Sequence, residues 1–213
     1  MKPDILLYGI LDPEHCGGRN LAKLAFIAAT NGATLLQYRD KVNDAPEQIK
    51  NVLAILKALQ GTKIPLIIND HVNVAAATKA GGVHLGQSDM NVEEARKILG
   101  TEKFIGLSIK TREEAKTAPV DEIDYAFIGG VFETKSKINP SGIGIAGWQD
   151  LANILRAKRS GLPIGAIAGI TSANVGEIME AGADGVALIS GLFLADDVAV
   201  ACQTMRRKIA SVR

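Results

Sequence analysis

Short apolar runs alternate with amphipathic segments along the whole chain. The apolar runs predict strands over 5–11, 33–38, 65–69, 82–85, 104–108, 125–129, 163–168 and 185–189. The amphipathic segments between them predict helices over 21–30, 46–59, 74–80, 92–99, 112–118, 147–157, 173–181 and 198–209. Strict alternation of strand and helix is typical of parallel strands joined by crossover helices.

A repeated phrase marks the turn from helix to strand. It is found at 31–36, 80–85 and 181–186, and in each copy a helical pattern stops at glycine and an apolar run begins. Glycine just past a helix end supplies the left-handed conformation that closes the helix. Eight such units in 213 residues predict an α/β fold, a single (β/α)8 TIM barrel that occupies residues 1–213 as one domain. A doubly wound open sheet shares the alternation and is the alternative.

Composition narrows the classes of function. Hydrophobic residues make up 47% of the chain and charged residues 22%, while the net charge is +1 with Lys and Arg scattered. A nucleic-acid partner normally requires a basic patch, so none is predicted. The longest apolar runs are too short to cross a bilayer, so no membrane partner is predicted either. Cys16 and Cys202 are too few for a disulfide framework, which indicates reduced thiols in a cytoplasmic protein.

Polar side chains follow the predicted strands, where a barrel of this kind carries its active site. The clearest case is Leu66-Ile67-Ile68, a run that predicts a buried strand, followed at once by Asn69 and Asp70. Burying a charged carboxylate is costly unless it is paired or bound to a metal. The side chains expected at this end come from seven strands and include Gln37, Arg39, Lys41, Asn69, Asp70, Asp89, Ser108, Thr134, Ser136, Lys137, Gly169, Ile189 and Ser190.

Asp70 and Asp89 leave adjacent predicted strands and so are predicted to meet around one hard cation. Mg²⁺ is typically held by one or two carboxylates together with substrate phosphates and water. Arg39, Lys41 and Lys137 are predicted on the same face, where they would neutralise a leaving pyrophosphate. Taken alone, Asp70 fits equally well as the cap of the helix that follows.

The loops after the seventh and eighth strands predict a second phosphate site. In many barrels these loops bind phosphate with backbone N–H groups, and Gly169 would allow the close approach, with Ser190 following the eighth strand. Asn174 is predicted to support the loop. Two separate phosphate sites imply two phosphorylated small-molecule ligands. His84 lacks zinc-site spacing and is predicted to be a hydrogen-bonded structural residue.

These motifs, in this order, resemble the thiamine-phosphate synthase family, also called thiamine-phosphate pyrophosphorylase. The matching phrases are Gln37-Tyr38-Arg39-Asp40-Lys41, Ile68-Asn69-Asp70, the run from Gly82 to Asp89, Gly106-Leu107-Ser108, the run from Phe132 to Lys137, Ala168-Gly169-Ile170-Thr171, the run from Ala181 to Val186, and Ile189-Ser190. The resemblance covers nearly the whole chain, from about residue 7 to about residue 193. It departs at Ala168 and Lys110, where the family often carries glycine and histidine.

The resemblance implies a transferase of thiamine biosynthesis that joins a pyrimidine pyrophosphate to a thiazole phosphate and releases pyrophosphate. It implies that the pyrimidine pyrophosphate is held by Gln37, Arg39, Lys41, Asn69, Ser108 and Lys137, of which Arg39, Ser108 and Lys137 would serve catalysis. It implies that the thiazole phosphate is held by Thr134, Ser136, Gly169, Ile189 and Ser190, and that Mg²⁺ is bound by Asp70 and Asp89.

Three rival functions share parts of this pattern. A thiazole tautomerase would carry histidine at the position of Gly130 and would tend to lack the paired carboxylates. A non-catalytic binder of thiamine intermediates would keep Gly169 and Ser190 without needing the charged residues. A barrel enzyme of unrelated phosphate metabolism is the third, because fold alone does not fix function. The sequence leaves the oligomeric state open.

Overall fold

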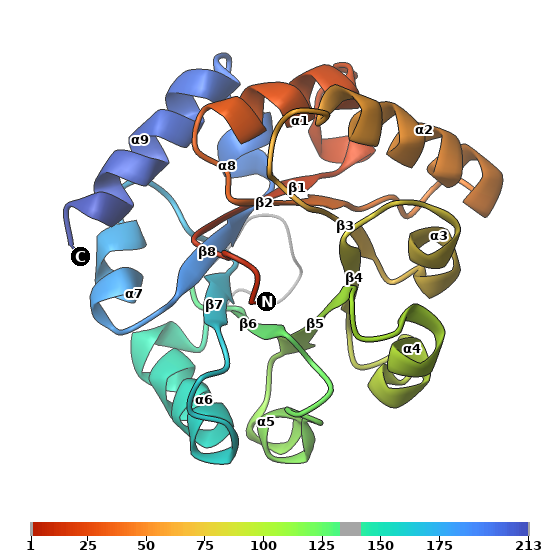
Figure 1. Cartoon of the computed structure of the whole chain (residues 1–213). Coiled ribbons are helices and arrows are strands. Elements are labelled where there is room, and N and C mark those ends of the chain that lie inside the picture. The colour runs from red at the N-terminus through yellow and green to blue at the C-terminus, as the bar shows by residue number, and fades with distance from the viewer. Residues whose placement is uncertain (1, 133–141, 213) are drawn as a thin grey trace.

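A closed barrel of parallel strands forms the centre of the molecule (Figure 1). The computed structural model describes residues 2–132 and 142–212. Within these residues the strands are β1 (Leu7–Leu11), β2 (Leu35–Tyr38), β3 (Leu66–Asn69), β4 (Gly82–Leu85), β5 (Phe104–Ile109), β6 (Tyr125–Gly129), β7 (Ile164–Ile167) and β8 (Gly185–Leu188). They pair in chain order, and β8 closes on β1 with Leu7 opposite Val186. The (β/α)8 barrel is therefore confirmed, and the open sheet is excluded.

The helices ring the barrel on its outside (Figure 1). Within the described residues they are α1 (Leu21–Thr30), α2 (Ala45–Ala58), α3 (Val72–Ala77), α4 (Val92–Leu99), α5 (Arg112–Thr117), α6 (Gly144–Lys158), α7 (Val175–Glu180), α8 (Ser190–Phe193) and α9 (Val198–Ala210), with a 3-10 turn η1 (Pro13–His15). Polar caps fix several starts: Asp44 accepts from the N–H of Glu47, and Asp197 accepts from that of Val200. Gly32 and Gly182 follow α1 and α7 with φ of 124° and 98°, as their turns require.

All the predicted strands and helices are present, with ends that differ by up to three residues. The helix predicted to begin at Gly147 begins at Gly144. Two short elements, η1 and α8, were not predicted. Both hold fewer than five residues, so neither repeats a hydrophobic period often enough to appear in the sequence pattern.

Two apolar clusters account for the core. The larger lies between the barrel wall and the helices, and the smaller fills the barrel interior. The interior cluster contains Ile5, Tyr8, Ile10, Leu35, Ile67, Tyr125, Phe127 and Ala187. Glycine on the neighbouring strand leaves room for one of its aromatic rings, because a Cβ added to Gly165 would lie 2.3 Å from the Phe127 ring. The barrel interior is therefore filled with packed side chains.

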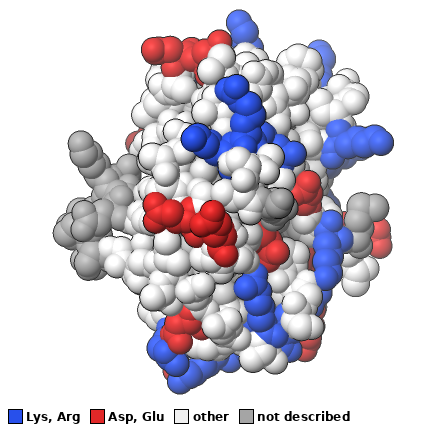
Figure 2. Space-filling view, turned by 90° about the vertical axis from the view of Figure 1, so that its left-hand side faces the viewer, with Lys and Arg blue, Asp and Glu red and all other residues white. Residues whose placement is uncertain are grey.

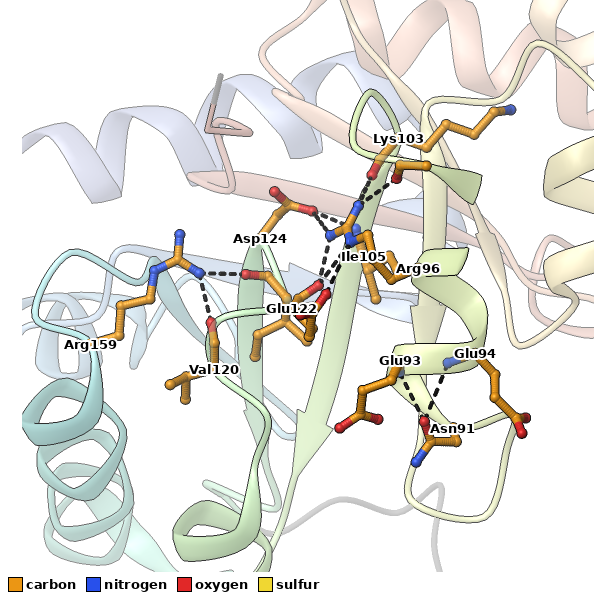
Figure 3. Close-up of polar contacts among 12 residues, drawn as sticks. Asn91, Glu93, Glu94, Arg96, Lys103, Ile105, Val120, Glu122, Asp124 and Arg159 are labelled. Carbon is orange, nitrogen blue, oxygen red and sulfur yellow. Dashed lines mark hydrogen bonds and ion pairs between the residues drawn. The ribbon is translucent and has the colours of Figure 1, made fainter. Parts of the chain in front are cut away.

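Charged side chains hold neighbouring segments together by hydrogen bonds at the N-terminal end of the barrel (Figure 3). Asp124 precedes β6, and its Oδ2 accepts from the backbone N–H of Ile105 at 2.8 Å and from Arg96 at 2.8 Å. Arg96 also donates to the carbonyls of Glu122 and Lys103. In the same way Asp184 precedes β8 and accepts from the N–H at the start of β7. These bonds serve stability, as is usual at this end of a TIM barrel.

The surface carries both signs of charge. The face seen in Figure 2 shows Lys and Arg side chains interspersed with Asp and Glu. This agrees with the scattered charges of the sequence and a net charge of +1. In the portion of the chain covered by the structure, no helix is long and apolar enough to span a membrane.

Candidate active site

A cavity of about 410 Å³ opens at the C-terminal ends of the strands. Its walls mix aromatic, aliphatic and polar side chains from β1 to β8. The residues that line it include Tyr8, Ile10, Gln37, Arg39, Asn69, His84, Ser108, Lys110, Phe127, Ile167, Ala168 and Ile189. A cavity of this size, apolar with a few convergent polar groups, is typical of a small-molecule site.

Four of the residues predicted to hold a pyrimidine pyrophosphate line this cavity: Gln37, Arg39, Asn69 and Ser108. Gln37 is almost fully buried on β2, and Ser108 lies near the end of β5. Lys41 lies outside the lining, with 45% of its side chain exposed. Lys137, Thr134 and Ser136 fall within 133–141, outside the described residues.

Beside the cavity, three charged groups form a cluster. Lys41 is ion-paired with Asp70, and the side chains of Asp70 and Asp89 are in hydrogen-bond contact. Asp89 is oriented by the backbone N–H of Gly86, which donates to its Oδ2 at 2.7 Å. Asp70 has φ of 60°, a left-handed conformation that few non-glycine residues adopt. The backbone is therefore bent at the point that turns this carboxylate toward Asp89.

The two carboxyl groups perturb each other. Burial and then the neighbouring Asp89 raise the pKa of Asp70, against the opposing effect of Lys41. Burial also acts to raise the pKa of Asp89, but hydrogen bonds from Asp70 and from the N–H of Gly86 outweigh it and lower that pKa. Two carboxylates that repel at close range lose that repulsion when a cation binds between them.

This pair fits a magnesium ion. Among residues 2–132 and 142–212, no three His, Cys, Asp or Glu side chains gather as a metal site. Asp70 and Asp89 could supply two ligands, with the remainder from water and substrate phosphate, which is how proteins usually hold Mg²⁺.

Asp70 does not cap the helix that follows it. The residue at the N-cap of α3 is His71, and α3 has no side-chain cap hydrogen bond. The Asp70 carboxylate instead contacts Lys41 and Asp89. Of the two interpretations of Asp70, the structure supports the one that gives it a role at the barrel mouth.

Arg39 has a partner that the sequence patterns did not indicate. Asp12, which directly follows β1 and is 1% exposed, forms an ion pair with the Arg39 guanidinium. Asp12 also accepts from the N–H of Glu14 at 3.0 Å and so begins η1. Since Arg39 follows β2, this pair joins neighbouring strand ends and fixes the guanidinium at the cavity wall. The only sequence signal was a carboxylate placed directly after an apolar run.

The loops after β7 and β8 adjoin the cavity. Ala168 and Ile189 line it, and Gly169 and Ser190 follow them in the chain. Ala168 has φ of 84°, which explains why glycine is the easier residue at this position. Asn174 supports the loop as predicted, because its amide donates to the carbonyl of Gly169 at 2.9 Å.

The cavity floor contains a hydrogen-bonded histidine. His84 is 7% exposed, and its Nε2 lies 2.9 Å from Ser108 Oγ while its Nδ1 lies 3.4 Å from Tyr125 Oη. The prediction of a hydrogen-bonded structural histidine is thus confirmed, although His84 also lines the cavity. Tyr8, Lys110 and Phe127 line it without having been predicted. Tyr8 and Phe127 carry no motif, so only the folded barrel reveals them, whereas Lys110 was marked by its departure from the family pattern two residues after Ser108.

The sequence model of the family described as thiamine monophosphate synthase matches residues 7–192. A thiamine-phosphate synthase of Agrobacterium fabrum is 47% identical over 209 residues, which cover 98% of this chain and 95% of the relative. The chain belongs to the thiamine monophosphate synthase family. A thiamine-phosphate synthase of Chloroflexus aurantiacus is 38% identical over 97% of this chain and 94% of its own length. The resemblance drawn from the motifs is confirmed.

Solved structures agree with the family. A thiamine phosphate pyrophosphorylase from Pyrococcus furiosus superposes with a TM-score of 0.84 at 29% identity, covering 98% of this chain and 97% of that one. A structure titled native KDPGal superposes with a TM-score of 0.71 at 20% identity, which shows the shared fold alone. Membership of this family indicates an enzyme of thiamine synthesis that acts on small molecules.

Proposed function

We propose that this enzyme joins a hydroxymethylpyrimidine pyrophosphate to a thiazole phosphate, making thiamine phosphate and releasing pyrophosphate. It would then be a transferase of a pyrimidinylmethyl group, working by dissociative substitution with the help of Mg²⁺. The observation that carries the proposal is the cluster of Lys41, Asp70 and Asp89 beside the cavity, in a chain of this family.

The cavity suits a flat heterocycle. Phe127, Tyr8 and Ile10 supply apolar walls, while Gln37 and Ser108 supply polar contacts at the same wall. Burying a ring against such walls contributes binding energy, and a small number of polar groups fix its orientation. The pyrimidine of the first substrate therefore belongs in this part of the site.

The charged cluster suits the pyrophosphate. Arg39 is held at the cavity wall by Asp12, and a guanidinium in an ion pair keeps other N–H donors for a phosphate. Lys41 adds a second cation. A Mg²⁺ ion held by Asp70 and Asp89 would supply further positive charge against the leaving pyrophosphate. Lys137 stays a predicted contributor from outside the described residues.

The second phosphate belongs to the loops after β7 and β8. Gly169 has φ of 68°, and the Asn174 amide holds its carbonyl, so the loop is fixed with backbone groups near the cavity. Ile189 lines the cavity and Ser190 begins α8 directly after it. A thiazole phosphate held here would present its ring nitrogen toward the pyrimidine. Thr134 and Ser136 stay predicted contributors.

The proposed reaction requires the protein to orient the two substrates and to stabilise the charges that develop on them. An electron-rich aminopyrimidine stabilises the positive charge that develops on its methylene carbon when the C–O bond to pyrophosphate breaks, and the thiazole nitrogen then captures that carbon. Arg39 and Lys41 stabilise the charge on the leaving oxygens, and the apolar walls exclude water from the cation. Orientation and preorganised charge of this kind are large sources of catalysis.

The decisive test is a direct assay. Purified protein is mixed with both substrates, once with Mg²⁺ and once with EDTA, and thiamine phosphate is measured as thiochrome fluorescence. Product that forms only with metal is the expected result. Absence of product in both mixtures, with folded protein, would overturn the proposal, and isomerisation of the thiazole phosphate would then be assayed.

A further inference from the structure

A continuous chain of hydrogen bonds crosses the barrel interior, and the residues at both of its ends line the cavity. Gln37 Nε2 donates to Tyr8 Oη at 2.7 Å, and Tyr8 Oη lies 3.1 Å from Tyr125 Oη. Tyr125 Oη lies 3.4 Å from His84 Nδ1, and His84 Nε2 lies 2.9 Å from Ser108 Oγ. The five side chains come from β2, β1, β6, β4 and β5 in that order.

With the Gln37 amide nitrogen facing Tyr8, one direction of proton donation satisfies this chain. Gln37 donates to Tyr8, so the Tyr8 hydroxyl proton still needs an acceptor, and the Tyr125 oxygen is the one beside it. In the reverse direction Tyr8 would accept from both neighbours, and its own buried proton would have no acceptor among the partners given by the structure. An unsatisfied buried polar group costs about 1–3 kcal/mol, which selects the forward direction.

The forward direction determines which atoms donate and which accept at the two ends of the hydrogen-bond chain, Ser108 and Gln37. The Tyr125 proton goes to His84 Nδ1, so the imidazole carries its hydrogen on Nε2 and donates it to Ser108 Oγ. Burial lowers the pKa of His84 to about 4, so the ring is neutral near pH 7. Ser108, having accepted, must donate its own proton elsewhere, and it lines the cavity. At the other end one N–H of the Gln37 amide is donated to Tyr8, and the carbonyl oxygen of the same side chain is left to accept.

The packing supports a dedicated role for Tyr125. It is fully buried and is not among the cavity-lining residues, so it acts through His84. A Cβ added to Gly106, on the strand between β4 and β6, would lie 2.2 Å from the Tyr125 ring and 2.5 Å from His84 Nδ1. Glycine at this position thus makes the contact between the phenol and the imidazole possible.

We propose that Tyr125 is a positioning residue that holds His84 as the Nε2–H tautomer and thereby makes Ser108 a hydrogen-bond donor into the cavity. Together with the accepting Gln37 carbonyl, this arrangement selects a heterocycle that offers both a ring-nitrogen acceptor and an amino donor. The selection of an aminopyrimidine rests on the function proposed above, whereas the tautomer of His84 does not.

The tautomer is tested by NMR. The chain contains three histidines, so ¹⁵N-histidine labelling gives few signals, and His84→Gln identifies the one of interest. A pyrrole-like shift for Nε2 and a pyridine-like shift for Nδ1 are expected in the wild type. The Tyr125→Phe variant, which keeps the ring, is expected to lose this preference. Protonation of Nδ1 in the wild type would overturn the proposal even if the protein proved inactive as a synthase.

Kinetics test the consequence. In Tyr125→Phe, KM for the pyrimidine pyrophosphate is expected to rise about fivefold to tenfold, the loss of roughly one hydrogen bond, while KM for the thiazole phosphate stays constant. The matched control is Tyr38→Phe, which removes another buried hydroxyl, one that binds Asp40 at 2.5 Å and Asn51 at 3.1 Å. The proposal would be overturned if Tyr38→Phe changed KM and the His84 tautomer in the same way, or if Tyr125→Phe changed neither of them. An inactive wild type would overturn only the synthase function.

Discussion

Replacing Asp70 with asparagine removes one charge from the carboxylate pair without changing the shape of the side chain. The backbone at this position has φ of 60°, which asparagine tolerates better than most residues. Alanine lacks that tolerance, and the left-handed conformation costs it about 1–2 kcal/mol. Asp70→Asn and Asp70→Ala therefore differ in backbone strain but share the loss of the carboxylate proposed to bind Mg²⁺.

The expected loss of activity is large and the expected loss of stability is small. Removing one preorganised charge contact typically lowers kcat by about 10²–10³, or about 3–4 kcal/mol of barrier. The lost ion pair with Lys41 is worth about 0–1 kcal/mol, because the Lys41 side chain is 45% exposed. Relief of repulsion from Asp89 offsets it. We expect Asp70→Asn to keep its unfolding free energy within about 1 kcal/mol.

Thiochrome rates over a Mg²⁺ titration measure the first effect, and urea unfolding in EDTA measures the second. Asp70→Ala is expected to match Asp70→Asn in activity and to unfold about 1–2 kcal/mol more easily. Asp197→Asn is the control, because it removes the same charge at the cap of α9, where asparagine also caps well. More than a tenth of wild-type activity in Asp70→Asn, with an unchanged metal requirement, would refute the role of this carboxylate.

Three further outcomes follow from other parts of the barrel. Burial lowers the pKa of His84 from 6.5 to about 4. Between these pH values the unfolded chain binds more protons at His84 than the folded protein does, so this residue lowers the free energy of unfolding as the pH falls. Urea unfolding should show His84→Gln losing less stability than wild type between pH 7 and pH 4, by up to about 3 kcal/mol. Ala168→Gly should raise the unfolding free energy in urea by about 0.5–1 kcal/mol, as relief of a φ of 84° exceeds glycine's entropy cost. Asp124→Ala should lower the unfolding free energy by about 2–3 kcal/mol, since the N–H of Ile105 and Arg96 lose their acceptor, and thermal melts against the wild type would reveal it.

The barrel was predictable because its signal is repeated. Helix-to-strand turns place Gly32, Gly61, Gly100 and Gly182 in the left-handed region, whereas Gly81, in the second copy of the repeated phrase, does not adopt the left-handed conformation predicted for it. The residue before several strands binds the backbone of the preceding strand. Thr34 accepts from the N–H of Leu7, and Asp124 accepts from that of Ile105. These requirements involve only neighbouring strand–helix units, so they produce a short motif that recurs along the sequence. The ends of helices are less well determined, since propensity changes gradually there.

Much of the site was predictable where polar residues interrupt or directly follow an apolar strand. Gln37, Arg39, Asn69 and Ser108 were found in this way, and all four line the cavity. Tyr8 and Tyr125 look like ordinary core residues, because the contact between them depends on β1 and β6 meeting across the interior. No local pattern records a contact between residues 117 positions apart.

The two ends of the barrel use their cations differently, and this difference locates function. At the N-terminal end, Lys103 donates to the carbonyls of Ala75, Thr78 and Ala80, and Arg159 donates to those of Val120 and Ile123. Arg96 pairs with Asp124 there and also donates to the carbonyls of Gly100, Lys103 and Glu122. Those donors are consumed by backbone groups that no ligand can displace without unfolding a turn. At the C-terminal end, Lys41 pairs with Asp70 while 45% of its side chain is exposed. Arg39 pairs with the buried Asp12 and keeps further N–H donors that a phosphate can use. Positive charge is thus committed to backbone groups where the fold must be held, and N–H donors remain available at the end where the proposed anionic substrate would bind.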